Sequence, residues 1–123
     1  MASEEIPTKV YLITTERDKS FDLKTYVNYS INQRRLENLN VLDFDFGLIF
    51  YKNFMPFFSD FDVALFKEDV PENGDMCVFR HKLTDMYWIG FKEELGYFDL
   101  EGKFLGDEIE YEVKGVLVNI ETT

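Results

Sequence analysis

Acidic side chains that stand close together are the first candidates for chemistry in this sequence. Asp43 and Asp45 lie in a stretch that alternates apolar and polar residues, and Asp60 and Asp62 flank a turn. Paired carboxylates of this kind serve acid–base catalysis or bind calcium. The same four residues also suit the solvated face of a strand and the entrance to the next strand, and this structural role is the one we expect.

Metal and thiol chemistry have little support. His81 is the only histidine, and Asp85 follows it across an expected reverse turn, so the pair supplies half of a metal site without a third ligand. Cys77 is the only cysteine. It has no intrachain partner for a disulfide, and within "DMCVF" we expect it to be a small buried residue in a reducing compartment. We therefore expect neither a metal nor a cofactor.

A serine activated by a lysine is the one nucleophilic arrangement that the sequence leaves to test. Ser59 closes the stretch "NFMPFFS", and Lys92 lies in "MYWIGFKEE". A hydroxyl becomes a nucleophile only when a base takes its proton, so these two side chains would have to meet in space.

Composition limits the class of protein. A chain of 123 residues with 46% hydrophobic and 17% aromatic residues has the length and the apolar content of one folded domain. Its formal charge of −11 repels nucleic-acid phosphates and anionic lipid alike. The first ten residues lack the features of a signal peptide, and no apolar run is long enough to span a bilayer. We expect a cytoplasmic protein that binds neither DNA nor membrane directly.

Short strands are expected to position these residues. Odd-numbered residues from Phe21 to Ile31 are mostly apolar, which predicts a strand, although a helix also fits there. Residues 41–51 predict a long strand, and the turn residues of "EDVPENGD" predict a hairpin between the strands on either side. The spacing of the runs indicates an all-β sandwich or barrel. The other expected strands are "KVYLITT", "FDVALFK", "MCVFR", "MYWIGFK", "YFDL" and "YEVKGVLVNI".

From about Asp45 to Ile120, roughly three fifths of the chain, the sequence resembles the C-terminal domain of LexA and of lambda-type phage repressors, a fold shared with signal peptidases. That family has an apolar strand, a Ser-Met-x-Pro turn, a Gly-Asp step and a second turn with Asn-Gly or Asp-Gly-Asp. "LIFYKNFMPFFSDFDVALFKEDVPENGDMCVFR" follows this layout, and "YEVKGVLVNIE" is similar to the family's last strand. The residues in register are Pro56, Asp60, Asp62, Asn73, Gly74 and Asp75.

The resemblance implies a β-clip barrel of short strands over residues 41–123, preceded by residues 1–40 as an N-terminal extension or extra β layer. It also implies that the catalytic dyad of the family is lost. The nucleophilic serine maps onto Asn53, which has no ionisable hydroxyl, and the methionine after it maps onto Phe54. The general-base lysine maps onto Gly90, or onto Ile89 with another count of the hairpin, and neither residue accepts a proton.

The resemblance therefore predicts a non-catalytic oligomerisation domain of a phage or prophage repressor. Such a domain forms a homodimer or higher homo-oligomer, and it would reach DNA only through a separate headpiece outside this chain. The expected contact surface is an apolar turn together with the last strand, although each of its residues also suits a core. Its candidate residues are Phe54, Met55, Phe57, Phe58, Val116 and Val118.

The strong negative charge supports an alternative function from another class. A stand-alone acidic protein of phage or mobile-element origin could bind and inhibit a basic host enzyme that acts on nucleic acids. That hypothesis predicts tight binding that weakens with salt, because the attraction is between opposite charges.

Overall fold

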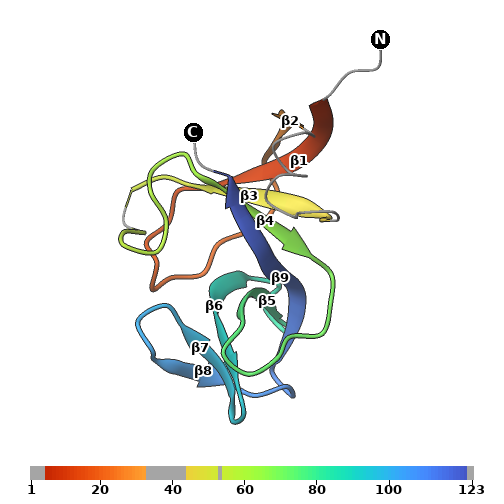
Figure 1. Ribbon diagram of the computed structural model, residues 1–123. Helices are drawn as coiled ribbons and strands as arrows, with labels where there is room; N and C mark the ends of the chain where they lie inside the picture. The colour runs from red at the N-terminus through yellow and green to blue at the C-terminus, as the bar shows by residue number, and fades with distance from the viewer. Residues whose placement is uncertain (1–4, 33–43, 53, 122–123) are drawn as a thin grey trace.

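The computed structural model describes residues 5–32, 44–52 and 54–121 of the chain. The protein is all-β, as the sequence predicts, and the described residues contain no helix. Figure 1 shows the strands in chain order. They are β1 (Glu5–Ile13), β2 (Tyr26–Asn32), β3 (Phe46–Phe50), β4 (Val63–Lys67), β5 (Met76–His81), β6 (Tyr87–Glu93), β7 (Gly96–Asp99), β8 (Phe104–Gly106) and β9 (Tyr111–Glu121).

The nine strands form one mixed sheet in the order β2-β1-β3-β4-β9-β5-β6-β7-β8. β1 and β3 are parallel, and all other neighbours are antiparallel. The expected barrel is wrong: in the described part of the chain β2 and β8 remain separate edges, and the sheet does not close. The reason lies in the strand order, because β2 and β8 end opposite halves of the sheet and the middle strand, β9, lies between these halves.

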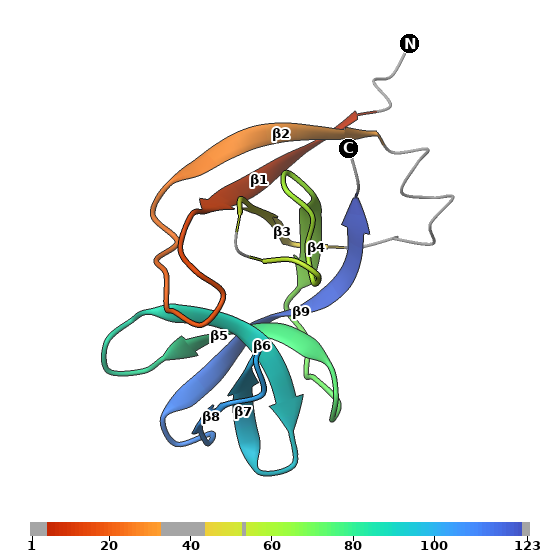
Figure 2. The same cartoon turned by 90° about the vertical axis from the view of Figure 1, so that its left-hand side faces the viewer.

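The long last strand divides the sheet into two lobes, which Figure 2 shows one above the other. The N-terminal lobe consists of β1–β4 and the second half of β9, and the C-terminal lobe consists of β5–β8 and the first half of β9. Val116 pairs with Lys67 of β4 on one side and with Cys77 of β5 on the other. Each pairing has a register shift, because β9 has an extra residue at Val118 opposite β4 and at Lys114 opposite β5. Such bulges bend a sheet.

The predicted hairpin around "EDVPENGD" is a second correction. Asn73 and Gly74 do form a turn, and Gly74 adopts a φ of 91°, which suits glycine. However, β4 and β5 do not pair with each other, because β9 lies between them. Turn residues indicate where a chain reverses direction, but the partner of each strand is decided by long-range contacts.

The strand predicted over residues 21–31 begins only at Tyr26. Before it, Phe21 leaves the N-terminal lobe and forms an isolated bridge to Tyr87, with two backbone hydrogen bonds of 2.8 Å. In Figure 2 the loop between β1 and β2 descends to the level of β5 and β6. The long strand expected over residues 41–51 is confined to Phe46–Phe50, and residues 41–43 lie outside the described residues.

Three apolar clusters stabilise this arrangement. The central cluster lies between the lobes, and a smaller cluster lies on the other face of each lobe. Both faces of β4 are buried. Ala64 and Phe66 belong to the central cluster, while Val63 and Leu65 belong to the outer cluster of the N-terminal lobe. In the C-terminal lobe, Cys77, Phe79, Tyr97 and Tyr111 form the outer cluster, while Val78 faces the centre.

Candidate functional site

The connection between β3 and β4 contains most of the candidate residues, and its aromatic side chains are turned inward. Phe54 and Phe58 are 2% and 1% exposed. Their ring centroids lie 4.6 and 4.2 Å from that of Phe50, at the end of β3. The backbone N–H groups of Phe57 and Phe58 both donate to the Phe54 carbonyl, at 2.9 and 3.0 Å. The apolar turn therefore fills the central core instead of framing an open cleft.

The two aspartates of this connection hold its backbone. Asp60 Oδ1 accepts a hydrogen bond of 2.8 Å from the Lys52 N–H, and Asp62 Oδ2 accepts one of 3.2 Å from the Ser59 N–H. Lys52 and Phe61 adopt positive φ angles of 59° and 69°. Carboxylates that accept backbone N–H bonds stabilise tight turns of this kind.

Asp45 has a similar task next to β3. Its Oδ2 accepts a hydrogen bond of 2.7 Å from the Glu68 N–H, which follows β4. Asp43 lies outside the described residues. The three described aspartates of this group thus accept backbone hydrogen bonds. Asp45, which we expected on the solvated face of a strand, lies just before β3 instead.

The expected contact surface is divided between core and surface. Phe54 and Phe58 are buried, Phe57 is half-buried against the central cluster, and Val116 is half-buried against the outer cluster of the C-terminal lobe. Met55 and Val118 are the exposed members of this set, at 56% and 38% exposure. Phe61 adds 53% exposure, and sequence reasoning missed it because the residue looks like an ordinary core aromatic.

The two positions matched to the Ser-Lys dyad offer no catalytic group. Asn53 lies outside the described residues. Gly90 pairs with Cys77 and Asp99 in the middle of the C-terminal lobe. A Cβ atom at Gly90 would lie 1.9 Å from the Phe98 carbonyl oxygen, so any side chain there would force β7 to move.

Ser59 and Lys92 are not brought together. Phe91 packs toward the turn, with its ring centroid 6.4 Å from that of Phe57. Adjacent residues of a strand point to opposite faces, so Lys92 points away from the turn. Its Nζ donates to the Glu93 carbonyl at 2.6 Å and lies 3.7 Å from Glu108 Oε1.

The side chains of His81 and Asp85 have separate partners, although the Asp85 N–H donates to the His81 carbonyl at 3.0 Å. The His81 Nδ1 accepts N–H bonds from Leu83 and Thr84 at 3.3 and 3.2 Å, as part of its turn. Asp85 pairs with Arg80 at 2.6 Å. Within residues 5–32, 44–52 and 54–121, no group of three potential metal ligands is assembled.

Cys77 is poorly suited to act as a nucleophile. Burial among apolar neighbours raises the pKa of its thiol to about 12, and the nearby Asp75 carboxylate adds to the effect. The reactive form of cysteine is the thiolate, which is scarce at neutral pH when the pKa is this high.

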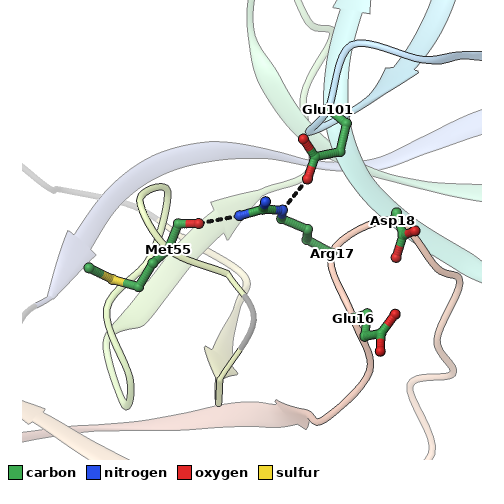
Figure 3. Close-up of a pocket in the computed structure, with 5 residues that line it drawn as sticks. All are labelled: Glu16, Arg17, Asp18, Met55 and Glu101. Carbon is green, nitrogen blue, oxygen red and sulfur yellow. Dashed lines mark hydrogen bonds and ion pairs between the residues drawn. The ribbon is translucent and has the colours of Figure 1, made fainter.

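A hollow of about 380 Å³ lies where the two lobes meet, and its central residue was not singled out by sequence reasoning. Figure 3 shows Arg17, from the loop after β1, between the Met55 carbonyl and the Glu101 carboxylate. Glu16 and Asp18 line the same hollow. Arg17 thus connects three segments that are distant in sequence, and only its position within the acidic stretch "ERD" could have drawn attention to it.

Comparison with known protein families, curated proteins and solved structures finds no match to this chain. Among the residues that the structure describes, there is no helix with the length and apolar character needed to span a membrane.

Proposed function

We propose that this chain is a non-catalytic oligomerisation domain of the type found in LexA-like and phage repressors, with a β-clip arrangement of its strands. The observation that carries the proposal is the closed connection after β3. Phe54 and Phe58 pack their rings on Phe50, where a Ser-Lys peptidase requires an open cleft for its substrate.

Two further observations support the loss of peptidase activity. The backbone at Gly90 leaves no space for a lysine, because the Phe98 carbonyl oxygen occupies it. Lys92 has the same strand parity as Gly90 and points away from the turn that contains Ser59, toward Glu108 at 3.7 Å. A general base must come within hydrogen-bonding distance of the proton it removes, and neither position satisfies this for Ser59.

The proposed activity is self-association in the cytoplasm. A homodimer of this domain would hold two DNA-binding headpieces at the spacing of two half-sites, while the domain itself makes no phosphate contact because its charge is −11. Exposed apolar side chains at Met55, Phe61 and Val118 support an apolar contribution to the contact.

Sedimentation equilibrium over a wide concentration range, at low and moderate salt, tests the proposal. We expect a monomer–dimer or higher equilibrium that persists when salt is added, because salt screens the repulsion between two acidic chains and leaves apolar contacts in place. A strict monomer at every concentration would contradict oligomerisation.

The loss of activity has its own test. Intact mass should stay unchanged after prolonged incubation at alkaline pH, because neither Ser59 nor Lys92 has the partner needed for self-cleavage. A cleaved chain or an acyl adduct that disappears in the Ser59→Ala variant would show a peptidase instead.

A second candidate function, binding to a basic protein such as a nucleic-acid enzyme, is favoured by a hollow of about 300 Å³ between the turns after β6 and β8. Lys92, Glu94, Asp107 and Glu108 line it together with the apolar side chains of Leu95 and Ile109, which are 77% and 82% exposed. Lys92 pairs with Glu108, so the carboxylates of Glu94 and Asp107 are the ones offered to a cationic partner. A partner segment with a cationic and an apolar side chain fits this surface.

Calorimetric titration with a lysine-rich peptide that contains leucine tests this second function. Binding should weaken with salt and with the Glu94→Gln variant, while Glu72→Gln, which removes a charge outside the hollow, should leave it unchanged. Equal affinity for both variants would show a non-specific attraction between opposite charges.

A further inference from the structure

The edge of the N-terminal lobe is an uncharged strand. β2 pairs with β1 on one side only, and no other strand of the described residues pairs with its outer side. Its seven residues, "YVNYSIN", contain neither a charge nor a proline, in a chain of which 30% is charged. Soluble proteins commonly protect such edges with lysine, proline or a bulge, because an open edge pairs with other strands. β2 has none of these features.

The two faces of β2 differ in character. Tyr29 and Ile31 belong to the outer cluster of the N-terminal lobe, and Val27 has the same parity on the strand. Val27 is 49% exposed, whereas Ile31 is fully buried. The apolar face of the lobe therefore continues along β2 and becomes accessible to solvent toward the start of the strand.

The opposite edge of the sheet offers a partner strand much less backbone to pair with. β8 contains only three residues, Phe104–Gly106, so it can form few backbone hydrogen bonds with a partner. The two edges also differ in their surroundings, because Lys103 and Asp107 directly flank β8. Of the two edges, β2 offers the longer uncharged backbone.

We propose that a second copy of this chain adds to the sheet through β2, so that two β2 strands pair antiparallel about a two-fold axis. This inference rests on the proposed self-association and names its surface. Two chains with a charge of −11 repel each other, and a strand without carboxylates is where their backbones can approach at the lowest electrostatic cost.

The symmetry of the pair agrees with the pattern of β2. In an antiparallel pair related by a two-fold axis between the strands, one residue pairs with its own symmetry mate, and the residues on either side then face residues of equal parity. Val27, Tyr29 and Ile31 of one copy would then continue the apolar face of the other. The outer clusters of the two N-terminal lobes would form one surface across the dimer.

The test compares two valines with sedimentation equilibrium on the full chain. Val27→Lys should raise the dimer dissociation constant at least about tenfold, because it places two like charges in the paired edge. Val70→Lys makes the same chemical change at an 84% exposed residue of the β4–β5 connection, and it should leave the constant unchanged. Circular dichroism confirms that both variants are folded.

The outcomes separate this inference from the function on which it rests. A wild-type chain that stays monomeric would overturn both. A wild-type dimer that Val27→Lys leaves intact would overturn the β2 surface alone, and oligomerisation would then have to use another surface such as Met55 and Val118.

Hydrogen exchange adds a readout of the backbone itself. Backbone amides of β2 that face away from β1 should become protected as the protein concentration rises through the dissociation constant. Amides of β8 are the internal control and should exchange at the same rate throughout. A dimer whose β2 amides exchange as they do in the monomer would overturn the inference.

Discussion

The two lobes differ in how their strands are connected along the chain. In the C-terminal lobe, β5, β6, β7 and β8 are neighbours both in sequence and in space, and each pairs antiparallel with the next. In the N-terminal lobe, β1 pairs parallel with β3, and β2 is placed outside both. The C-terminal lobe thus depends on short connections, whereas the N-terminal lobe depends on contacts between distant segments, which cost more chain entropy to form.

This difference also bears on the proposed self-association. The hairpins of the C-terminal lobe end in the short strand β8, which leaves little edge. The N-terminal lobe ends in the seven-residue strand β2, whose outer side is open among the described residues. A surface for another chain is therefore expected on the lobe that is built from long-range contacts.

The largest expected effect comes from removing a buried ring in either lobe. Phe58→Ala in the central cluster and Phe79→Ala in the C-terminal lobe should each lower the free energy of unfolding by about 3–5 kcal/mol, because each leaves a cavity. Urea unfolding is followed by far-UV circular dichroism and by the fluorescence of Trp88, the only tryptophan. Since β9 runs through both lobes, both signals should change in one transition.

Two separate unfolding transitions would contradict the prediction that the lobes unfold together. If Phe58→Ala shifted the circular dichroism signal and left the Trp88 signal at the wild-type urea midpoint, the lobes would be independent folding units. The comparison between the lobes would then describe two domains.

Gly90→Ala in the C-terminal lobe should lower the free energy of unfolding by a smaller amount. The new Cβ would lie 1.9 Å from the Phe98 carbonyl oxygen, and separating β6 from β7 should cost about 3 kcal/mol. Gly102→Ala is the control, because nothing lies within 4 Å of a Cβ there. Its φ of 86° alone should cost about 1–2 kcal/mol in the same urea experiment. Equal losses would show that the close approach at Gly90 is relieved without cost.

The contact between the lobes through Arg17 should contribute less to the free energy of unfolding. Arg17→Ala removes the hydrogen bond to the Met55 carbonyl and the ion pair to Glu101, both at the surface, so we expect a loss of about 1 kcal/mol or less. Hydrogen exchange at the Phe21–Tyr87 bridge should become faster, because this bridge holds the same loop. Lys19→Ala on that loop is the control. Equal exchange rates in the two variants would show that Arg17 does not hold the loop in place.

The effect of alkaline pH comes last because it is absent at neutral pH and develops only above about pH 9. Burial raises the pKa of Cys77 and of Tyr97 to about 12 each, from ordinary values of 9 and 10. The unfolded chain therefore loses these protons first, so the stability is fully present below about pH 9 and declines as the pH rises toward 12.

Urea midpoints measured over this alkaline range check the prediction. Tyr97→Phe should make the decline with pH less steep, because the phenol proton is removed from the balance. Tyr26→Phe, at a half-exposed position of the other lobe, is the matched variant. An unchanged slope in Tyr97→Phe would contradict the role of the buried phenol.

The amount that could be predicted differs between the lobes for the same reason. Runs such as "MCVFR" and "MYWIGFK" became β5 and β6 with the turn "HKLTD" between them, because alternation and turn residues act over a few positions. The hairpin predicted around Asn73 and Gly74 was wrong, because β9 enters between β4 and β5 from the far end of the chain. No local pattern contains that information.

The candidate site shows the same limit. The absence of an ionisable hydroxyl at Asn53 and of a side chain at Gly90 can be read from the sequence alone. The inward packing of Phe54 and Phe58, and the opposite faces of Phe91 and Lys92 relative to the turn, depend on which strands meet.

The sequence by itself determined that this protein is all-β and strongly acidic, and that positions 53 and 90 carry no ionisable side chain. Side-chain alternation, turn residues and charge are local properties, so they act wherever the segment is placed. The tertiary structure alone decided the parallel pair of β1 and β3, the central place of β9, the contact of Arg17 between the lobes and the edge at β2, which the other described strands leave unpaired. These features depend on which distant apolar faces bury each other, and that balance belongs to the whole chain.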